Sequence, residues 1–422
     1  MLFDIEDSLF TRGYAKAVDL LSNCRTDDGF LASRQDHDNY KRIWARDGAI
    51  ITLAALLTGE KKLIGCGAKT LLTLARHQGP HGEIPSNVDP ATKRISYGGN
   101  AGRVDSNLWF IIACAEYWHC TEDDGFLREI HQSMENARFL LGAWEYNNRD
   151  LLYVPLTGAW ADEYLHNGYV LYDQLLYLQA LRSMCAIHAA MHGSEDHRLL
   201  QKLNRLKHLL PTNYWLGRDR KPAAEDVYHE VLFQKGLKAA ATHCNEKYWM
   251  PFFSPIGYGY RFDAFANVLA CLLKIAEPFQ QKAVDIHIEH ITRDNSLKLL
   301  PAFHPVITPK DEDWQELQMT FSYSFKNKPY EFQNGGLWPM ITGFYVADLA
   351  QRGKREAALQ FLAAIHRANS GGGENGEWLF PEFIHGKSFE AGGTMFQGWS
   401  AAAAIIGHHA VEGKNVLHFM PA

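Results

Sequence analysis

The sequence predicts an all-α fold in which helical hairpins close into a ring, and three observations support this prediction. Apolar residues recur at helical spacing in about a dozen windows, strand-like alternation is scarce, and six connecting segments are rich in aromatic and polar side chains. The 422 residues, 46% hydrophobic and 12% aromatic, are enough to bury a large core. No Pro/Ser-rich or single-charge linker divides the chain, so we expect residues 1–422 to form one domain.

Helices account for most of the expected elements, and several of them are paired across a glycine. In residues 61–77, apolar side chains recur at spacings of 3 and 4 between Ile64 and Ala75, which places them on one helix face. Gly59 and Gly353 each follow a helix end and precede a charged start of the next helix, a layout typical of a helical hairpin. Helices are expected at 8–23, 47–58, 61–77, 105–119, 126–144, 169–191, 196–209, 261–275, 279–292, 339–351, 355–368 and 397–410.

The connecting segments decide between an open and a closed arrangement of these helices. Six of them mix Trp or Tyr with carboxylates and amides. An open solenoid would spread such side chains along a concave face, whereas a closed double ring collects alternate connections at one end. We therefore expect a closed ring with one pocket at its end. The six segments are 40–48, 102–110, 157–169, 327–339, 376–386 and 393–400.

Composition and charge exclude several classes of function. The 42 Lys and Arg residues against 48 Asp and Glu residues give a net charge of -6, without the basic stripe that nucleic-acid binding requires. No apolar run reaches the about 18 residues of a membrane span, and the N-terminal sequence lacks a basic start, so we expect a cytoplasmic protein. Seven cysteines without C-x-x-C spacing predict no disulfide, no metal and no cofactor. Periodicity does not decide between a monomer and a homo-oligomer.

The six segments have the composition of a carbohydrate site. Indole rings stack on the C–H faces of sugars, while Asp, Glu, Arg and Asn side chains hold sugar hydroxyls through paired hydrogen bonds. Single residues also fit structural roles: Trp109 and Trp338 stand at helix starts and would suit core packing, and Asp105 would suit a helix N-cap. The combination of all six segments favours a carbohydrate ligand.

Several stretches resemble parts of known glycosidases, from about residue 40 to residue 410: "GRVDSNLWFIIACAEYW", "RFDAFANVLACLLKIAE", "FQNGGLWPMITGFYVADLA", and "PEFIHGK" followed by "QGWSAAAAI". They are similar to the neutral/alkaline invertase family and to the glucosidase domain of glycogen-debranching enzymes. Both groups are (α/α)6-toroid glycoside hydrolases, so the resemblance implies a toroid of six helical hairpins that hydrolyses a glycosidic bond. It leaves the substrate open among sucrose, another small α-glucoside, and a glycoside of a compatible solute such as glycerate.

The resemblance also implies two catalytic carboxylates. Asp162 of "WADEY" would be the general acid and Glu382 of "PEF" the base that activates water, so that the product has inverted anomeric configuration. Ala161 stands where debranching enzymes usually have methionine, and Glu163 follows Asp162. Either Asp162 or Glu163 is therefore a candidate for the acid.

Further residues are expected to bind the substrate. The resemblance implies that Arg46, Asp47 and Asp105 hold the sugar in the reacting subsite. The other expected contacts are Trp44, Trp109, Trp160, Asn334, Trp338, His385, Gln397 and Trp399.

Four residues near these segments have less defined roles. Glu374 and Glu377 lie on the glycine-rich approach to Glu382 and would serve as supporting or lid residues. Glu331 would hold a sugar hydroxyl. His385 would either do the same or close its own loop.

The setting of Glu382 follows from its neighbours in the sequence. Pro381 precedes it, and the aromatic side chains around it are Trp378, Phe380 and Phe383. Poor solvation among these rings is expected to raise the pKa of Glu382. Hydrolysis needs one protonated and one ionised carboxyl group, supplied by different elements. Pro381 is also expected to bias Phe380 to an extended backbone.

Two other classes of protein fit parts of the pattern. A sugar epimerase or lyase on the same toroid would use histidine, tyrosine or arginine bases, and no pair of these dominates the six segments. A non-catalytic carbohydrate-binding protein would keep the aromatic residues without the carboxylate pair. Release of reducing sugar from a disaccharide separates a hydrolase from both.

Overall fold

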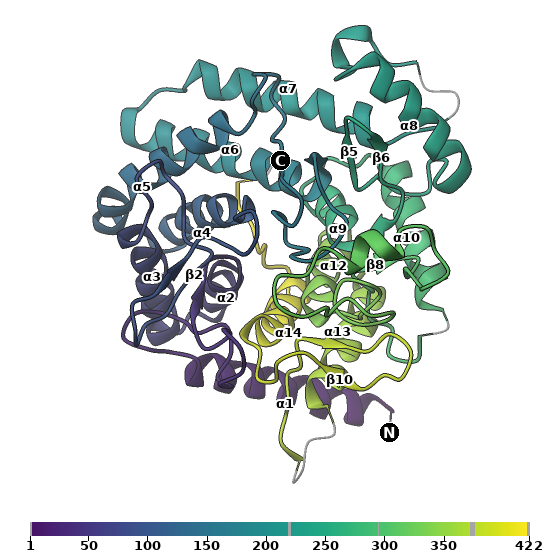
Figure 1. The fold of residues 1–422 in the computed structure, drawn as a ribbon. Coiled ribbons are helices and arrows are strands. Elements are labelled where there is room, and N and C mark those ends of the chain that lie inside the picture. Colours follow the sequence, from purple (N-terminus) through teal and green to yellow (C-terminus); the bar gives the residue numbers. More distant parts are fainter. Residues whose placement is uncertain (1, 218–220, 294, 372–375, 420–422) are drawn as a thin grey trace.

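Helices arranged in two concentric rings make up most of the structure (Figure 1). The structure is a computed structural model that describes residues 2–217, 221–293, 295–371 and 376–419. No helix in these residues is long and apolar enough to cross a membrane. The helices are α1 (Leu2–Asn23), α2 (Ala45–Thr58), α3 (Lys61–Arg76), α4 (Asp105–Thr121), α5 (Asp124–Ala143), α6 (Leu171–His192), α7 (His197–Tyr214), α8 (Glu230–His243), α9 (Ala264–Leu272), α10 (Pro278–Thr292), α11 (Trp314–Gln318), α12 (Pro339–Gln351), α13 (Arg355–Ser370), α14 (Gly398–Val411) and the 3-10 helix η1 (Ala224–Asp226).

The inner ring forms the core of the described structure. Its six helices are α2, α4, α6, α9, α12 and α14, each in contact with the next, and α14 contacts α2, so the ring closes. These helices are mostly apolar and buried along most of their length, and the residues of α9 are buried without exception. A helix with this composition must be covered all round, which the ring neighbours and the outer helices achieve.

The outer ring consists of amphipathic helices. α3, α5, α7, α10 and α13 each follow an inner helix and bury one face, as their spacing of apolar residues predicts. α1 packs against α13 and α14 and takes the sixth outer position. The predicted (α/α)6 toroid is thereby confirmed.

Every predicted helical window coincides with a helix, but the end of α7 differs from the prediction. The prediction ended this helix at residue 209, whereas it continues through Pro211 to Tyr214. Its last turn is buried, and the Tyr214 hydroxyl donates a hydrogen bond to the carbonyl of Tyr169 (2.9 Å). These tertiary contacts offset the helix hydrogen bond that proline removes.

Two helices, α8 and α11, lie outside the predicted windows. Gly236 weakens the helical pattern of α8, yet a Cβ at this position would lie 2.7 Å from side-chain atoms of both Leu216 and Tyr258. Glycine therefore allows α8 to pack closely against the loop end of the toroid. α11 has only five residues, too few to show a helical period.

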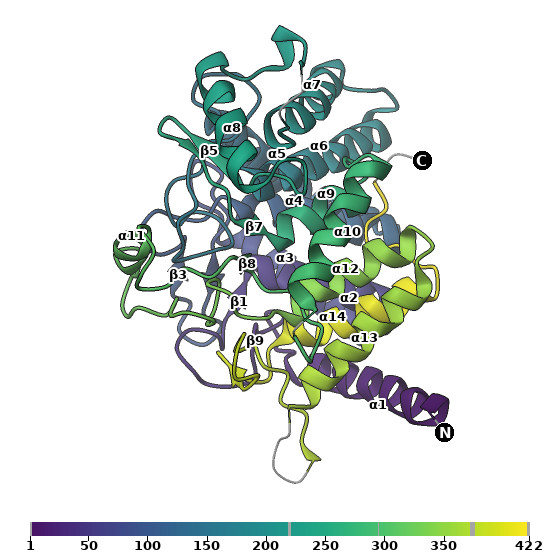
Figure 2. The ribbon, with the colours of Figure 1, turned by 90° about the vertical axis from the view of Figure 1, so that its right-hand side faces the viewer.

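Short antiparallel strands gather at the end of the toroid that lies away from the chain termini (Figure 2). They form two three-stranded sheets, β1–β2–β3 and β4–β5–β6, and two pairs, β7–β8 and β9–β10. Strands of two or three residues show no alternation in a sequence, so they were not predicted. Their bounds are β1 Ile43–Trp44, β2 Asn87–Val88, β3 Ile95–Ser96, β4 Tyr169–Val170, β5 Phe252–Ser254, β6 Gly257–Tyr258, β7 Phe262–Asp263, β8 Phe303–His304, β9 Phe383–Ile384 and β10 Ala391–Gly392.

Candidate active site

A cavity of about 590 Å³ opens among the loops at this end of the toroid. Each of the six aromatic and polar segments contributes at least one lining residue, which confirms that they meet at one place. The lining residues are Asp38, Asn39, Tyr40, Arg42, Trp44, Arg46, Asp47, Ser86, Asn87, Arg94, Ile95, Ser96, Gly98, Gly99, Arg103, Asp162, Glu163, Ser322, Tyr323, Ser324, Lys326, Phe332, Gln333, Trp338, Glu382 and Trp399.

Glu382 lines this cavity from a rigid hairpin. It directly precedes β9, which pairs with β10, and the Glu382 amide donates to the carbonyl of Thr394, two residues after β10 (2.9 Å). The Thr394 amide donates to Glu382 Oε2 (3.1 Å), and the Tyr40 hydroxyl donates to Oε1 (2.7 Å). The residue is 3% exposed, and burial raises the pKa of Glu382 to about 7.

Gly393 makes room for the Glu382 carboxylate. Its φ is +71°, and a Cβ at this position would lie 2.2 Å from Glu382 Oε2. A side chain there would displace the carboxylate and would also strain the backbone. The hairpin therefore holds Glu382 in one position because residue 393 is glycine.

The expected extended backbone at Phe380 is wrong. Phe380 has a φ of +44°, in the left-handed region that is uncommon for a non-glycine residue. Its amide donates to the carbonyl of Asn369 (3.0 Å), and its carbonyl accepts from the amide of Gln397 (2.9 Å). The Phe380 ring is also buried, 5.8 Å from that of Trp378. These contacts offset the local strain.

Asp162 reaches the same cavity from the loop between α5 and β4, and its neighbours are cations. Its Oδ1 lies 3.2 Å from Arg103 Nε and 3.5 Å from Arg46 Nη2. The Arg103 guanidinium also donates to the carbonyl of Thr157, which ties it to the same loop. About 30% of the Asp162 side chain is exposed. Its carboxylate is therefore fixed by ion pairs and remains open to a ligand.

Glu163 also lines the cavity, but its contacts run to a neighbouring loop. Its Oε1 accepts a hydrogen bond from the amide of Ser322 (2.9 Å). Its carbonyl accepts from the side chains of Thr320 (2.7 Å) and Asn327. The structure thus gives Glu163 a part in holding the segment 320–327 against the site.

Arg46 and Asp47 lie in the first turn of α2. Arg46 Nη1 donates to buried Asp105 Oδ2 (2.8 Å), which also accepts from the Tyr172 hydroxyl (3.2 Å). Asp105 does not line the cavity and does not cap α4, so it acts on the site through Arg46. Asp47 accepts from Gln397 Nε2 (3.0 Å), and burial raises the pKa of Asp47 to about 6.

The predicted tryptophans divide into two groups. Trp44, Trp338 and Trp399 line the cavity, and Trp399 lies 5.7 Å from the Arg46 guanidinium. Trp109 and Trp160 do not line it. The indole of Trp109 donates to the Tyr172 hydroxyl (2.7 Å), and Trp160 stacks on Phe303, so both belong to the core beneath.

Three other predicted residues hold the loops rather than line the cavity. The Asn334 side chain accepts a hydrogen bond from the Ile307 amide (2.7 Å) and donates one to the Ile307 carbonyl (2.8 Å). His385 Nδ1 accepts from the amides of Lys387 (3.2 Å) and Ser388 (3.0 Å), so it closes its own loop. Gln397 positions Asp47, as described above.

Glu331 and Glu377 do not line the cavity. Glu377 pairs with Arg34 (3.5 Å), and Glu331 is half-buried outside the lining. Glu374 lies outside the described residues.

The sequence prediction missed three residues that shape the site: Tyr40, Arg103 and Lys326. Tyr40 and Arg103 lie within predicted segments, two to six residues from predicted site residues. Their membership of these segments could therefore have identified them as candidates. Lys326 Nζ pairs with Asp38 (3.1 Å), which also lines the cavity, and it stands just before the segment 327–339.

Comparison with known proteins links the chain to one family. Residues 27–413 match the family model described as alkaline and neutral invertase. Cytosolic invertase 1 of Oryza sativa subsp. japonica is 23% identical over 428 residues, 90% of this chain and 73% of that protein. Probable alkaline/neutral invertase F of Arabidopsis thaliana is 24% identical over 422 residues, 87% and 80% of the two chains.

Solved structures share the fold. A GH63 mannosylglycerate hydrolase from Thermus thermophilus in complex with glucose has a TM-score of 0.66 at 14% identity, over 93% of this chain and 98% of that chain. A rhamnosidase from Klebsiella oxytoca with rhamnose bound has a TM-score of 0.60 at 14% identity, over 94% and 63%. At these identities the likeness concerns the toroid alone.

Proposed function

Because the chain belongs to the family of alkaline and neutral invertases, and is therefore a glycoside hydrolase, we propose that it hydrolyses a small α-glucoside such as sucrose with inversion of configuration. The rice and Arabidopsis relatives, named as invertases, align with 90% and 87% of the chain. A cavity of about 590 Å³ falls within the range of about 300 to 1,000 Å³ that small-molecule sites occupy. The closed inner ring supports a single catalytic domain over residues 1–422.

The observation that carries this proposal is the pair of carboxylates in one cavity. Asp162 and Glu382 come from segments far apart in the sequence and have different environments. Inverting hydrolysis uses two carboxyl groups, of which one donates a proton while the other accepts one.

Glu382 suits the role of base. Its two oxygens accept from Tyr40 and Thr394, which aims the carboxylate, and its pKa of about 7 permits ionisation in neutral and alkaline solution. In the proposed reaction it takes a proton from water as the water attacks the anomeric carbon.

Asp162 is the proposed acid. It donates its proton to the glycosidic oxygen as the bond to the anomeric carbon breaks, and the leaving alcohol carries that proton away. Arg46 and Arg103 hold the side chain in place. Glu163 is the alternative acid, but its side chain is engaged with the Ser322 amide.

The remaining lining residues suit sugar binding. Arg46 and Asp47 present charged groups that hold hydroxyls through strong hydrogen bonds. Trp44, Trp338 and Trp399 offer aromatic surface to the sugar ring.

A second substrate class, a glycoside whose leaving group is an anion such as glycerate, is favoured by the cations of the lining. Arg42 Nη1 donates to the uncharged side chain of Asn87 (3.1 Å). Within the described chain, no carboxylate pairs with Arg94, which is exposed at the cavity. The structural neighbour from Thermus thermophilus is named as a mannosylglycerate hydrolase.

The test is hydrolysis of a substrate panel followed by NMR. Sucrose, maltose, trehalose, glucosylglycerate and mannosylglycerate are incubated with the full chain, and released reducing sugar is measured. The fresh product of the best substrate should show β-glucose if an α-glucoside is cleaved with inversion. Fresh α-glucose formed from the glycosyl unit, as distinct from a glucose leaving group, would contradict inversion, and hydrolysis of none of the α-glucosides would contradict the substrate class. Loss of turnover in Glu382→Gln ties the activity to this cavity.

A further inference from the structure

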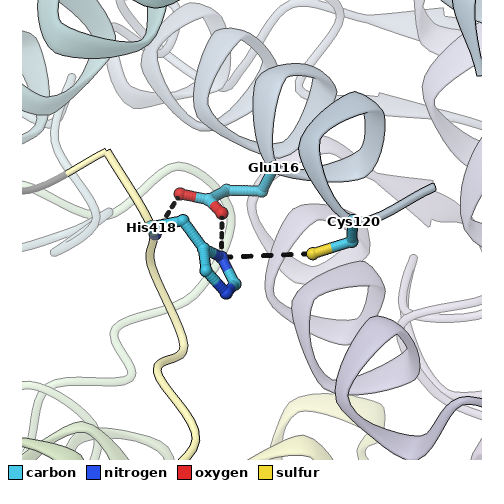
Figure 3. Close-up of side chains that lie close together, drawn as sticks. All are labelled: Glu116, Cys120 and His418. Carbon is cyan, nitrogen blue, oxygen red and sulfur yellow. Dashed lines mark hydrogen bonds and ion pairs between the residues drawn. The ribbon is translucent and has the colours of Figure 1, made fainter. Parts of the chain in front are cut away.

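Figure 3 shows a second cluster of reactive side chains, Glu116, Cys120 and His418. Two of them belong to the C-terminal part of α4, whereas Asp105 begins this helix. Glu116 and Cys120 are one turn apart on the same face of this helix. At about 1.5 Å per residue, they lie roughly 16 and 22 Å along the helix from Asp105. His418, in the segment after α14, points between them.

The three side chains converge on one point. His418 Nδ1 lies 2.8 Å from Glu116 Oε2 and 4.0 Å from Cys120 Sγ. The three possible ligand atoms all lie within 4.8 Å of one another. A tetrahedral zinc ion with ordinary bond lengths would place nitrogen about 3.3 Å from oxygen and about 3.6 Å from sulfur. Shifts of about half an ångström therefore create a zinc geometry.

The direction of the contacts distinguishes a metal site from a catalytic triad. In a Cys–His–Glu triad, the thiol and the carboxylate face different nitrogens of the imidazole, because the ring passes a proton between them. Here both Glu116 and Cys120 face the same nitrogen, Nδ1. Atoms that surround a single point are arranged as ligands of one ion.

The surroundings suit a bound ion that is exchangeable with solvent. Glu116 is 1% exposed, and its Oε1 accepts from the backbone amide of His418 (2.8 Å), which fixes the carboxylate. Cys120 and His418 are exposed, so an ion can enter. They line a cavity of about 410 Å³ with Lys414 and Asn415, which has room for a water as fourth ligand.

We propose that Glu116, Cys120 and His418 bind one zinc ion, which fastens the segment after α14 to the end of α4. A thiolate, an imidazole and a carboxylate together favour zinc over calcium or magnesium, which take oxygen ligands. Binding releases the thiol proton and the Nδ1 proton of His418 to solvent. The ion is structural, because the cluster lies outside the catalytic cavity. Sequence spacing hid this site, because His418 comes 302 positions after Glu116.

The test measures metal binding directly, on the full chain without a histidine tag. The protein is stripped with a chelator, and zinc is then titrated while bound metal and Tm are measured. One zinc per chain and a rise in Tm are expected. Cobalt in place of zinc should give an absorption band from thiolate to cobalt.

Matched variants decide whether these residues are the ligands. Cys120→Ser should abolish the cobalt band and weaken zinc binding by more than about 100-fold, since loss of even an outer partner costs about 10- to 100-fold. His418→Ala should weaken it similarly. Cys185→Ser changes a half-buried cysteine of α6 outside the cluster and should leave binding unchanged.

Two results would overturn the proposal. One is the absence of stoichiometric zinc in the folded wild-type chain. The other is equal zinc affinity in wild type, Cys120→Ser and His418→Ala. Neither result bears on glycoside hydrolysis, which is assayed separately.

Discussion

The two walls of the candidate active-site cavity hold their carboxylates by different means. Glu382 sits in a hairpin, 3% exposed, and receives hydrogen bonds from a hydroxyl and an amide, with no ion pair to any residue that the structure describes. Asp162 sits in a loop, with about 30% of its side chain exposed, between two guanidinium groups. One wall fixes a carboxylate through neutral donors and burial, the other through charge. Two like side chains in one cavity therefore have different electrostatic environments.

The largest expected effect separates Asp162 from its neighbour Glu163. Asp162→Asn should lower kcat by about 10² to 10⁴, because it removes a proton donor while keeping the shape of the side chain. Glu163→Gln should cost far less, because the Ser322 amide can still donate to the amide oxygen. Steady-state kinetics on the best substrate checks both variants. If Glu163→Gln abolishes turnover and Asp162→Asn retains it, the acid is Glu163.

Displacement of the Glu382 carboxylate within its hairpin should lower the activity. Gly393→Ala places a Cβ 2.2 Å from Glu382 Oε2, and a displacement of about 1 Å at a reacting group can cost about 10²-fold in rate. Gly59→Ala is the matched control, since Gly59 has the same φ of +71° with no neighbour within 4 Å. Both variants should lose stability, and only Gly393→Ala should lose activity beyond its loss of folded protein. If Gly393→Ala and Gly59→Ala have equal activity per folded molecule, Gly393 is not needed to hold the Glu382 carboxylate in position.

The protonation of Glu382, which the Tyr40 hydroxyl influences, should set the pH dependence of the activity. If Glu382 is the base, kcat/KM should fall as the pH drops through about 7, where the carboxylate takes up a proton. Asp47, with a pKa raised to about 6, adds to the loss at lower pH. Tyr40→Phe removes a donor that favours the ionised form of Glu382, so the pKa of Glu382 rises further.

The fall of kcat/KM at low pH should therefore begin at a higher pH in Tyr40→Phe than in wild type. At alkaline pH, kcat/KM of this variant should be reduced by less than about tenfold. Activity that instead falls as the pH rises through about 7 would make Glu382 the acid. If kcat/KM depends on pH in the same way in Tyr40→Phe and in wild type, the Tyr40 hydroxyl does not affect the pKa of Glu382.

The smallest effect concerns stability. Folding raises the pKa of Glu382 from 4.5 to about 7, so its protonated form stabilises the fold and its ionisation lowers the free energy of unfolding, by on the order of 3 kcal/mol at most. Glu382→Gln has no such ionisation. Its Tm should therefore exceed that of wild type at pH 8 and approach it near pH 5. Glu331→Gln, outside the cavity, is the control.

A Tm difference that stays constant between pH 5 and pH 8 would contradict this account of Glu382. A Glu331→Gln difference that grows in the same way would show that the effect is not specific to the cavity.

Helices and the location of the site were predictable from the sequence, whereas the contacts of single residues were not. Inner helices are apolar around most of their surface, whereas outer helices are apolar on one face. Both patterns can be read from the sequence without knowledge of tertiary contacts. Trp160 and Trp338 both stand in the predicted aromatic and polar segments and pack 5.7 Å apart, yet only Trp338 lines the cavity. The backbone of Phe380 depends on partners that lie elsewhere in the chain, Asn369 and Gln397.

The closure of the inner ring by α2 and α14 sets the order of events during synthesis. Asp47 and Gln397, which bond across this closure, are 350 positions apart. At about 5 to 20 residues per second, a ribosome needs roughly 20 to 70 s to pass from one to the other. Throughout that interval α2, which is mostly apolar, lacks the neighbour that completes its burial. The nascent chain thus carries α2 incompletely buried until α14, the last helix of the described residues, has been synthesised and can pack against it.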